Sequence, residues 1–164
     1  MKIIFIRHAD SNKNELTKKG MKQAKILAEK LMEEKIDEIY CSNLRRAKQT
    51  AEIIRRRIKI KPKIENSLNE FESEMIKKPK GRWNKKEKER YKKLVKFLKS
   101  LTKNPDENKT ILIVSHGVTN RIILAYFLGI NLKKAIRFWQ NEAAINSIYW
   151  SKKFKNWRLE RWNC

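Results

Sequence analysis

The sequence lacks the features that mark several classes of protein. Of its 164 residues only two are cysteine, Cys41 and Cys164, which is too few for a disulfide framework. The apolar runs at 3–6 and 111–114 are four residues long, whereas a membrane-spanning helix needs about 20 apolar residues and a signal-peptide core roughly 7–15. These absences predict a reduced, cytoplasmic protein with no membrane segment.

Acidic residues are scarce as well. Asp and Glu number 18 against 41 Lys and Arg, which leaves a formal charge of +23, whereas a small domain ordinarily carries a net charge of roughly 2–8. One interpretation is an anionic partner, such as nucleic acid, a phosphoprotein or a phosphorylated small molecule. The other is a Lys-rich composition with no role in function. Charge alone does not decide between them, so the partner must be inferred from particular residues.

The apolar pattern predicts a single domain, residues 1–164, in which strands alternate with helices. Hydrophobic residues make up 40% of the chain, too many for a disordered basic tail. Strands are expected at 2–6, 38–41, 58–64, 110–115, 144–150 and 157–162, and helices at 16–34, 42–57, 91–101, 118–128 and 131–139. This alternation predicts an α/β fold, a three-layer α/β/α sandwich with a mainly parallel sheet.

Local signals set several of these boundaries. Thr17, Ser42 and Asn131 are expected to cap their helices, and Gly129 to end the helix at 118–128. Pro62 favours an edge position for the strand at 58–64. Residues 66–90 read as irregular, and 151–156 as the turn of a hairpin.

The candidate catalytic and binding residues come directly after the predicted strands. His8 comes after the first strand and His116 after the strand at 110–115, and these are the only two histidines. Arg46 lies in the first turn of the helix after the second strand. Ligands of such sheets bind beyond the carboxyl ends of the strands, and helix N-termini favour anions. We therefore expect these residues to converge on one anion. Two histidines with a stray acidic or thiol group fall short of a usual zinc ligand set, so no metal is expected.

Five motifs, in order over residues 3–129 and so over most of the chain, resemble those of the histidine phosphatase superfamily, also called the phosphoglycerate mutase-like family. They are Arg7-His8 followed by Asn14, the patterns L-T-x-x-G-x-x-Q-A at 16–24 and S-x-L-x-R-A-x-Q-T-A at 42–51, Leu68-Asn69-Glu70, and Ser115-His116-Gly117. Ala9 stands where the family usually has Gly. The resemblance implies a phosphoglycerate mutase-like fold and a compact, phosphatase-type member of the family.

The resemblance also implies residue roles. His8 would attack phosphorus and form a phosphohistidine, which divides one difficult step into two. The phosphate-binding groups would be Arg7, Asn14, Arg46, His116 and Gly117. Arginine suits this task because its planar guanidinium binds phosphate through two donors. In the motif at 42–51 the functional arginine would be Arg46, and Arg45 would be its variable neighbour. No cofactor is implied.

The general acid is assigned to Glu70, which would protonate the leaving oxygen and then activate water. Glu72 and Glu74 follow closely in the same segment. Glu72 is the alternative acid. The other alternative is that these acidic residues only form a solvated loop with no role in catalysis.

Three functions follow. A metal-independent phosphoric monoester hydrolase of the histidine acid phosphatase type, acting on a phosphorylated small molecule, a phosphoprotein or phosphohistidine, is favoured. A phosphoglycerate-type mutase is the alternative, although mutases carry a long insertion and need a lid, and here only 46 positions separate Glu70 from His116. Basic and aromatic residues at 152–158 suggest a catalytically weak nucleic-acid or phosphoprotein-binding module. They are also typical of an edge hairpin protected by lysines. Weak, non-specific nucleic-acid binding is expected; the substrate and the oligomeric state are not predicted.

Overall fold

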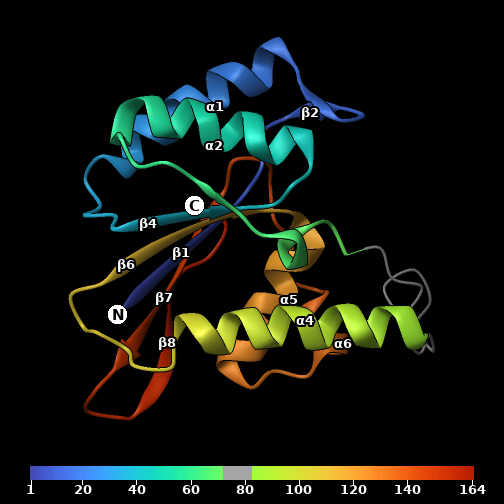
Figure 1. Ribbon diagram of the computed structural model, residues 1–164, viewed down its shortest axis with the longest axis vertical. Coiled ribbons are helices and arrows are strands. Elements are labelled where there is room, and N and C mark those ends of the chain that lie inside the picture. Colours follow the sequence, from blue (N-terminus) through green and yellow to red (C-terminus); the bar gives the residue numbers. More distant parts are fainter. Residues whose placement is uncertain (72–82) are drawn as a thin grey trace.

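A computed structural model of the protein describes residues 1–71 and 83–164. A six-stranded sheet in the order β5-β4-β6-β1-β7-β8 lies between two layers of helices (Figure 1). Its strands are β1 (Lys2–Arg7), β4 (Glu38–Cys41), β5 (Lys63–Ile64), β6 (Thr110–Ser115), β7 (Ile145–Ser151) and β8 (Asn156–Arg161). Two further short strands, β2 (Ser11–Asn12) and β3 (Glu15–Leu16), pair with each other outside this sheet.

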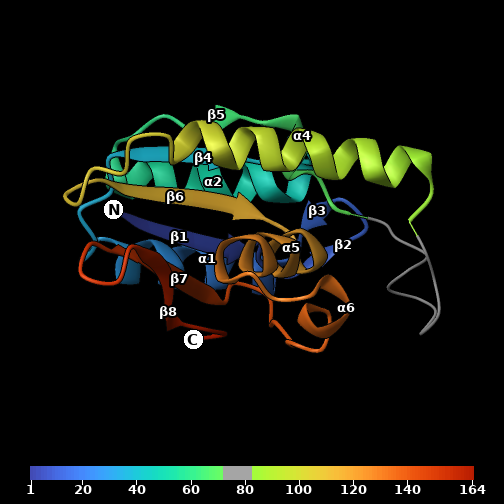
Figure 2. The ribbon, with the colours of Figure 1, turned by 90° about the horizontal axis from the view of Figure 1, so that it is seen from below.

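The helices cover both faces of the sheet (Figure 2). One layer contains α1 (Lys18–Leu31) and α2 (Arg45–Ile58); the other contains α4 (Lys85–Leu101), α5 (Gly117–Leu128) and the short α6 (Leu132–Ala135), with the 3-10 turn η1 (Asn66–Leu68) beside α4. None of the helices in the described residues is both long and apolar enough to cross a membrane.

Alternation along β1 divides the core between the two layers. Ile4 and Ile6 face α1 and α2, whereas Ile3 and Phe5 face α4 and α5. All four side chains are fully buried. A central strand that is apolar on both faces is what a sheet covered by helices on both sides requires. The predicted three-layer α/β/α sandwich is therefore confirmed.

The sheet is parallel where the predicted site lies and antiparallel at one edge. The strands β5, β4, β6 and β1 run parallel, and β7 and β8 form the predicted hairpin, antiparallel to β1 and to each other. The register between β1 and β6 pairs Arg7 with Ser115 at their carboxyl ends. The next residue of each strand is a histidine, so this register determines how the two histidines meet.

Two of the predicted helix starts need correction. The helix expected at 16–34 begins at Lys18, because Leu16 belongs to β3, and it ends at Leu31. Thr17 caps this helix as predicted, since its side chain accepts from the Gly20 N–H. The second helix begins at Arg45 rather than after Ser42, and the cap position at Leu44 has no side-chain hydrogen bond. Ser42 lies before the cap position; its hydroxyl accepts from the Leu44 N–H at 3.1 Å and also bonds to His116.

Other boundaries differ for local reasons. The strand expected at 58–64 is reduced to Lys63–Ile64, since α2 continues through Ile58 and is capped by Lys59 in the left-handed conformation. The predicted edge position of this strand is confirmed. Within 66–90, η1 forms and α4 begins at Lys85 after an Asn84–Glu87 capping box. Asn131 caps α6 as expected, but the helix ends at Ala135 instead of 139. Gly129, in the left-handed conformation, ends α5 as predicted.

Candidate active site

The two histidines meet at the carboxyl ends of β1 and β6. The backbone N–H of His8 donates to the Ser115 carbonyl at 2.9 Å, which continues the strand pairing by one residue. The ring centroids of His8 and His116 are 5.0 Å apart, with the rings inclined by 62°. Both side chains are buried. The parallel register thus brings together residues 108 positions apart in the sequence.

The hydrogen bonds of His8 define its tautomer. Its Nδ1 lies 2.8 Å from the Ala9 carbonyl oxygen, which can only accept, so Nδ1 carries the proton. Its Nε2 accepts from the Nε–H of Arg46 at 2.9 Å. Burial, together with the charges of Arg46 and Arg7, lowers the pKa of His8 to about 4. At neutral pH the ring is therefore uncharged and Nε2 has a lone pair, which a nucleophile requires.

Arg46 links His8 to an open cleft. Its Nη1 donates to Asn14 Oδ1 at 3.1 Å. The cleft, of about 600 Å³, is lined by Lys13, Asn14, Leu44, Arg46, Asn66, Asn69, Glu70 and Arg90. Within the described residues Arg46 has no carboxylate partner, whereas Arg45 projects away and pairs with Glu15 at 2.6 Å. The cationic group beside His8 is thus available to an incoming anion.

Arg7, unlike Arg46, has a carboxylate partner among the described residues. Its Nη1 donates to the Gln140 carbonyl at 2.7 Å, and its Nη2 pairs with Glu142 at 2.6 Å. The Arg7 side chain also passes close to Gly117, where an added Cβ would lie 3.6 Å from Arg7 Cδ, an ordinary contact. Glu142 balances part of the charge of Arg7 and fixes its orientation. No signal in the sequence pointed to Glu142 or Gln140.

A chain of hydrogen bonds orients His116. Ser42 Oγ donates to Asn69 Oδ1 at 2.9 Å, so it accepts from the Nε2–H of His116 at 2.8 Å. His116 Nδ1 is consequently unprotonated, and it is buried with no hydrogen-bond partner among residues 1–71 and 83–164. Burial, with the neighbouring His8 and the arginines, lowers the pKa of His116 to about 2. Ser42 and Asn69 were not among the predicted site residues, although both lie within motifs.

Glu70 faces the same point. Its Oε2 lies 3.7 Å from His116 Nδ1, and its Oε1 accepts from the Val118 N–H at 3.3 Å. Burial raises the pKa of Glu70, and the charge of Arg46 opposes this rise. A carboxyl group with a raised pKa keeps its proton to higher pH, as a general acid must. The alternative acid, Glu72, lies outside the described residues.

The other motif residues shape the loop that carries His8. The Ala9 N–H donates to Thr50 Oγ1 at 3.1 Å and the Asp10 N–H to Gln23 Oε1 at 2.8 Å. A Cβ at Gly20 would lie 1.9 Å from the Asp10 carbonyl oxygen, so only glycine allows α1 to pack this closely. The motifs at 16–24 and 42–51 therefore position the nucleophile loop as well as supplying Arg46.

Among the described residues one group has the composition of a metal site. Ligand atoms of His8, Glu70 and His116 lie within 4.8 Å of one another. Arg46 donates to the histidine nitrogen that a metal would need, and the Arg7 guanidinium is also close enough to affect the pKa of both histidines. Two fixed positive charges repel a cation and attract an anion. The arrangement therefore fits a phosphate group better than a metal ion.

Comparisons with known proteins agree with this geometry. The family model of the histidine phosphatase superfamily (branch 1) matches residues 3–164. Phosphoserine phosphatase 1 of Hydrogenobacter thermophilus is 30% identical over 183 aligned positions, which cover 91% of this chain and 86% of the relative.

Solved structures show the same fold. A putative alpha-ribazole-5'-P phosphatase of Escherichia coli aligns with a TM-score of 0.82 at 20% identity, covering 100% of this chain and 97% of the other. A mycobacterial glucosyl-3-phosphoglycerate phosphatase aligns with a TM-score of 0.80 at 20% identity, covering 99% of this chain and 98% of the other. The predicted phosphoglycerate mutase-like fold is thereby confirmed, and the chain belongs to the histidine phosphatase superfamily.

Proposed function

We propose that this protein is a metal-independent phosphatase that hydrolyses small phosphate monoesters through a phosphohistidine at His8. The observation that carries the proposal is the hydrogen bond from Arg46 to Nε2 of a neutral, buried His8. It combines an unprotonated nucleophile with a cation that has no carboxylate partner in the described residues. Acyl or glycosyl chemistry does not need such a cation at the nucleophile, whereas phosphoryl transfer depends on it.

In the first step the substrate phosphate displaces Arg46 from Nε2. Arg46 and Arg7 then bind the phosphoryl oxygens. The lone pair of Nε2 forms the N–P bond while the P–O ester bond breaks in line with it, and protonated Glu70 gives its proton to the leaving alcohol. A substrate that enters as the monoanion can pass its phosphate proton to His116 Nδ1, which then donates to a phosphoryl oxygen; this proton returns to the inorganic phosphate when it leaves.

In the second step water replaces the alcohol. Ionised Glu70 takes a proton from the water as its oxygen attacks phosphorus, and the N–P bond breaks. Inorganic phosphate leaves, His8 regains its neutral form, and Glu70 is again protonated. The same carboxyl group thus acts as acid and then as base, and no metal ion or cofactor is required for either step.

Phosphatase rather than mutase activity is supported by the relatives, which are named as phosphatases. Phosphoserine, glucosyl-3-phosphoglycerate and alpha-ribazole phosphate, which appear in the relatives' names, are small metabolites with one phosphate ester. We extend this substrate class, though no single member of it, to this protein. A mutase would return the phosphoryl group to a second organic molecule, so the product distinguishes the two reactions.

The test is a panel of phosphate monoesters, including phosphoserine, assayed with a chelator present. Release of inorganic phosphate is measured for the wild type and for His8→Ala purified in parallel. We expect turnover of at least one ester by the wild type and none by His8→Ala. Equal phosphate release by the two proteins, or activity that the chelator abolishes, would refute the proposal.

A further inference from the structure

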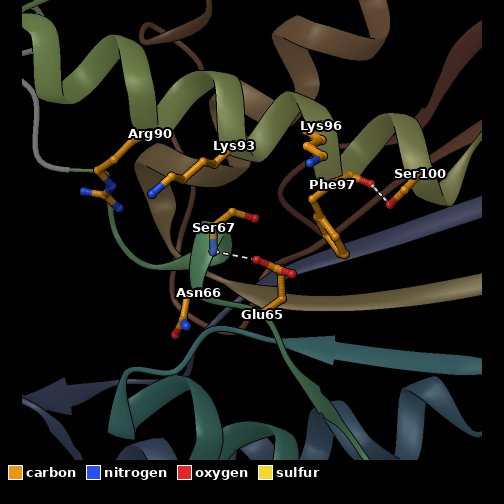
Figure 3. A pocket seen from close by; sticks show the side chains of 8 residues that line it. All are labelled: Glu65, Asn66, Ser67, Arg90, Lys93, Lys96, Phe97 and Ser100. Atoms are coloured by element: carbon orange, nitrogen blue, oxygen red, sulfur yellow. Dashed lines mark hydrogen bonds between the residues drawn. The ribbon is translucent and has the colours of Figure 1, made fainter.

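A second hollow adjoins the cleft of the candidate active site. This α4 groove, of about 480 Å³, lies between α4 and the segment that follows β5 (Figure 3). Its lining residues are Glu65, Asn66, Ser67, Arg90, Lys93, Lys96, Phe97 and Ser100. None of them has a role in the chemistry described above.

The groove and the cleft are neighbours. Asn66 and Arg90 line both hollows. The Nη2 of Arg90 donates to the backbone carbonyls of Asn69 at 3.2 Å and Glu70 at 2.9 Å, and its guanidinium lies 4.8 Å from the ring centroid of Phe71. Arg90 is therefore fixed at the junction, bonded to the backbone of the proposed acid itself. The groove thus lies beside the cleft that Arg46 and Glu70 line.

The walls of the groove are predominantly positive. Arg90, Lys93 and Lys96 project from α4, and Figure 3 shows them across from Glu65, Asn66 and Ser67. Within the described residues none of the three cations has an ion-pair partner, and the carboxylate of Glu65 accepts from the Ser67 N–H at 2.8 Å. Phe97, partly buried, provides an apolar surface. Three cations against one carboxylate favour an anion on a short carbon skeleton.

We propose that the α4 groove is a substrate subsite that binds a second acidic group, a phosphate or a carboxylate, carried by the phosphate ester that His8 cleaves. This inference rests on the proposed function, since it requires an ester bound at His8. It narrows the substrate class to esters with an acidic group some distance from the reacting phosphate. The ordinary alternative is a lysine-rich helix face that only interacts with solvent.

Straight-chain probes measure the distance between the two sites. The value of kcat/KM is determined for alkyl monophosphates, for α,ω-alkanediol bisphosphates and for ω-carboxyalkyl phosphates of increasing length. We expect an optimum length at which the doubly acidic esters exceed the monophosphate of equal length by about fivefold to tenfold, in the range expected from two or three partly exposed ion pairs. The bisphosphate and carboxylate series distinguish the two acidic groups.

The variant Lys93→Ala/Lys96→Ala is expected to lose this preference. The matched control is Lys92→Ala/Lys99→Ala, which removes the same charge from exposed positions of the same helix outside the groove, and it is expected to keep the preference. Equal loss in both variants would show that only the overall charge matters and would overturn the subsite.

Calorimetric binding of non-hydrolysable α,ω-bisphosphonates and monophosphonates separates the two proposals. If monophosphates are hydrolysed and the doubly acidic esters are not preferred to them at any chain length, the subsite is overturned and the phosphatase proposal stays intact. If no ester is hydrolysed but bisphosphonates bind severalfold more tightly than monophosphonates, and Lys93→Ala/Lys96→Ala abolishes the difference, the phosphatase proposal fails and the anion site stands.

Discussion

The Nε–H of Arg46 donates to Nε2 of His8 at 2.9 Å. This bond joins the atom proposed to attack phosphorus to the group proposed to bind the phosphoryl oxygens. The same guanidinium charge contributes to the low pKa of His8, after burial as the main cause. One contact thus helps burial to keep the nucleophile neutral and orients a cation toward the position that a phosphate would occupy.

The first prediction separates Arg46 from its neighbour Arg45. Arg46→Ala should lower kcat/KM by about 30-fold to 10³-fold, or roughly 2–4 kcal/mol, as the loss of one oriented donor to a transition state does. Arg45→Ala should remain close to wild type, since Arg45 pairs with Glu15 at the surface. Steady-state kinetics of both variants test this. The opposite ranking would mean that the residue facing the anion has been misassigned.

The second prediction concerns pH. His8 must be neutral, so kcat/KM should rise as pH increases through its pKa of about 4. Glu70 must be protonated, so kcat/KM should fall as pH passes its raised pKa. A bell-shaped profile with an acidic optimum is therefore expected.

The variant Glu70→Gln should lose the alkaline limb of this profile and keep the acidic one. Comparing the two proteins on the same ester removes the contribution of substrate ionisation, which is common to both. An alkaline limb that persists in Glu70→Gln would assign it to another group.

The third prediction uses the leaving group to identify the acid. Glu70→Gln should slow alkyl phosphates far more than an activated aryl phosphate, because a good leaving group departs without a proton. The measured quantity is the ratio of kcat/KM for the two esters. If Glu72→Gln changes this ratio and Glu70→Gln does not, the acid is Glu72.

The fourth prediction addresses the charge of +23. If it draws anionic substrates to the site, kcat/KM should fall with ionic strength, because the screening length shrinks from about 10 Å at 0.1 M salt to about 3 Å at 1 M. The kcat on a small saturating ester should hardly change. RNA binding should be weak and disappear near physiological salt. Sub-micromolar RNA binding at that salt, without turnover of any monoester, would favour the nucleic-acid module.

The sequence predicted the parts of the site that belong to regular strands and motifs. His8 and His116 could be paired from sequence because each follows an apolar run that forms a central parallel strand. Arg46 followed from the helix after β4. These predictions need only periodicity, strand order and the motif register.

The remaining parts depend on long-range packing. Glu142 reaches Arg7 from the loop before β7, 135 positions away, and nothing in its local sequence marks it. Ser42 was predicted to be a helix cap because its type favours that role; its hydroxyl does accept from the Leu44 N–H, but it also bonds to His116 and Asn69, which local sequence does not indicate. The α4 groove arises where η1 packs beside α4, a contact that periodicity cannot predict.

The most direct test is to trap the phosphoenzyme. Wild-type protein mixed with an activated aryl phosphate and quenched within milliseconds in alkali should carry one acid-labile phosphoryl group, mapped to His8 by mass spectrometry. His8→Ala should carry none, while Arg45→Ala, which alters an exposed neighbour of the site, should still be labelled. A phosphoryl group on His8 that forms and decays at rates consistent with turnover is the predicted result. Steady turnover with no label on His8, or with undiminished rate in His8→Ala, would contradict the phosphohistidine mechanism.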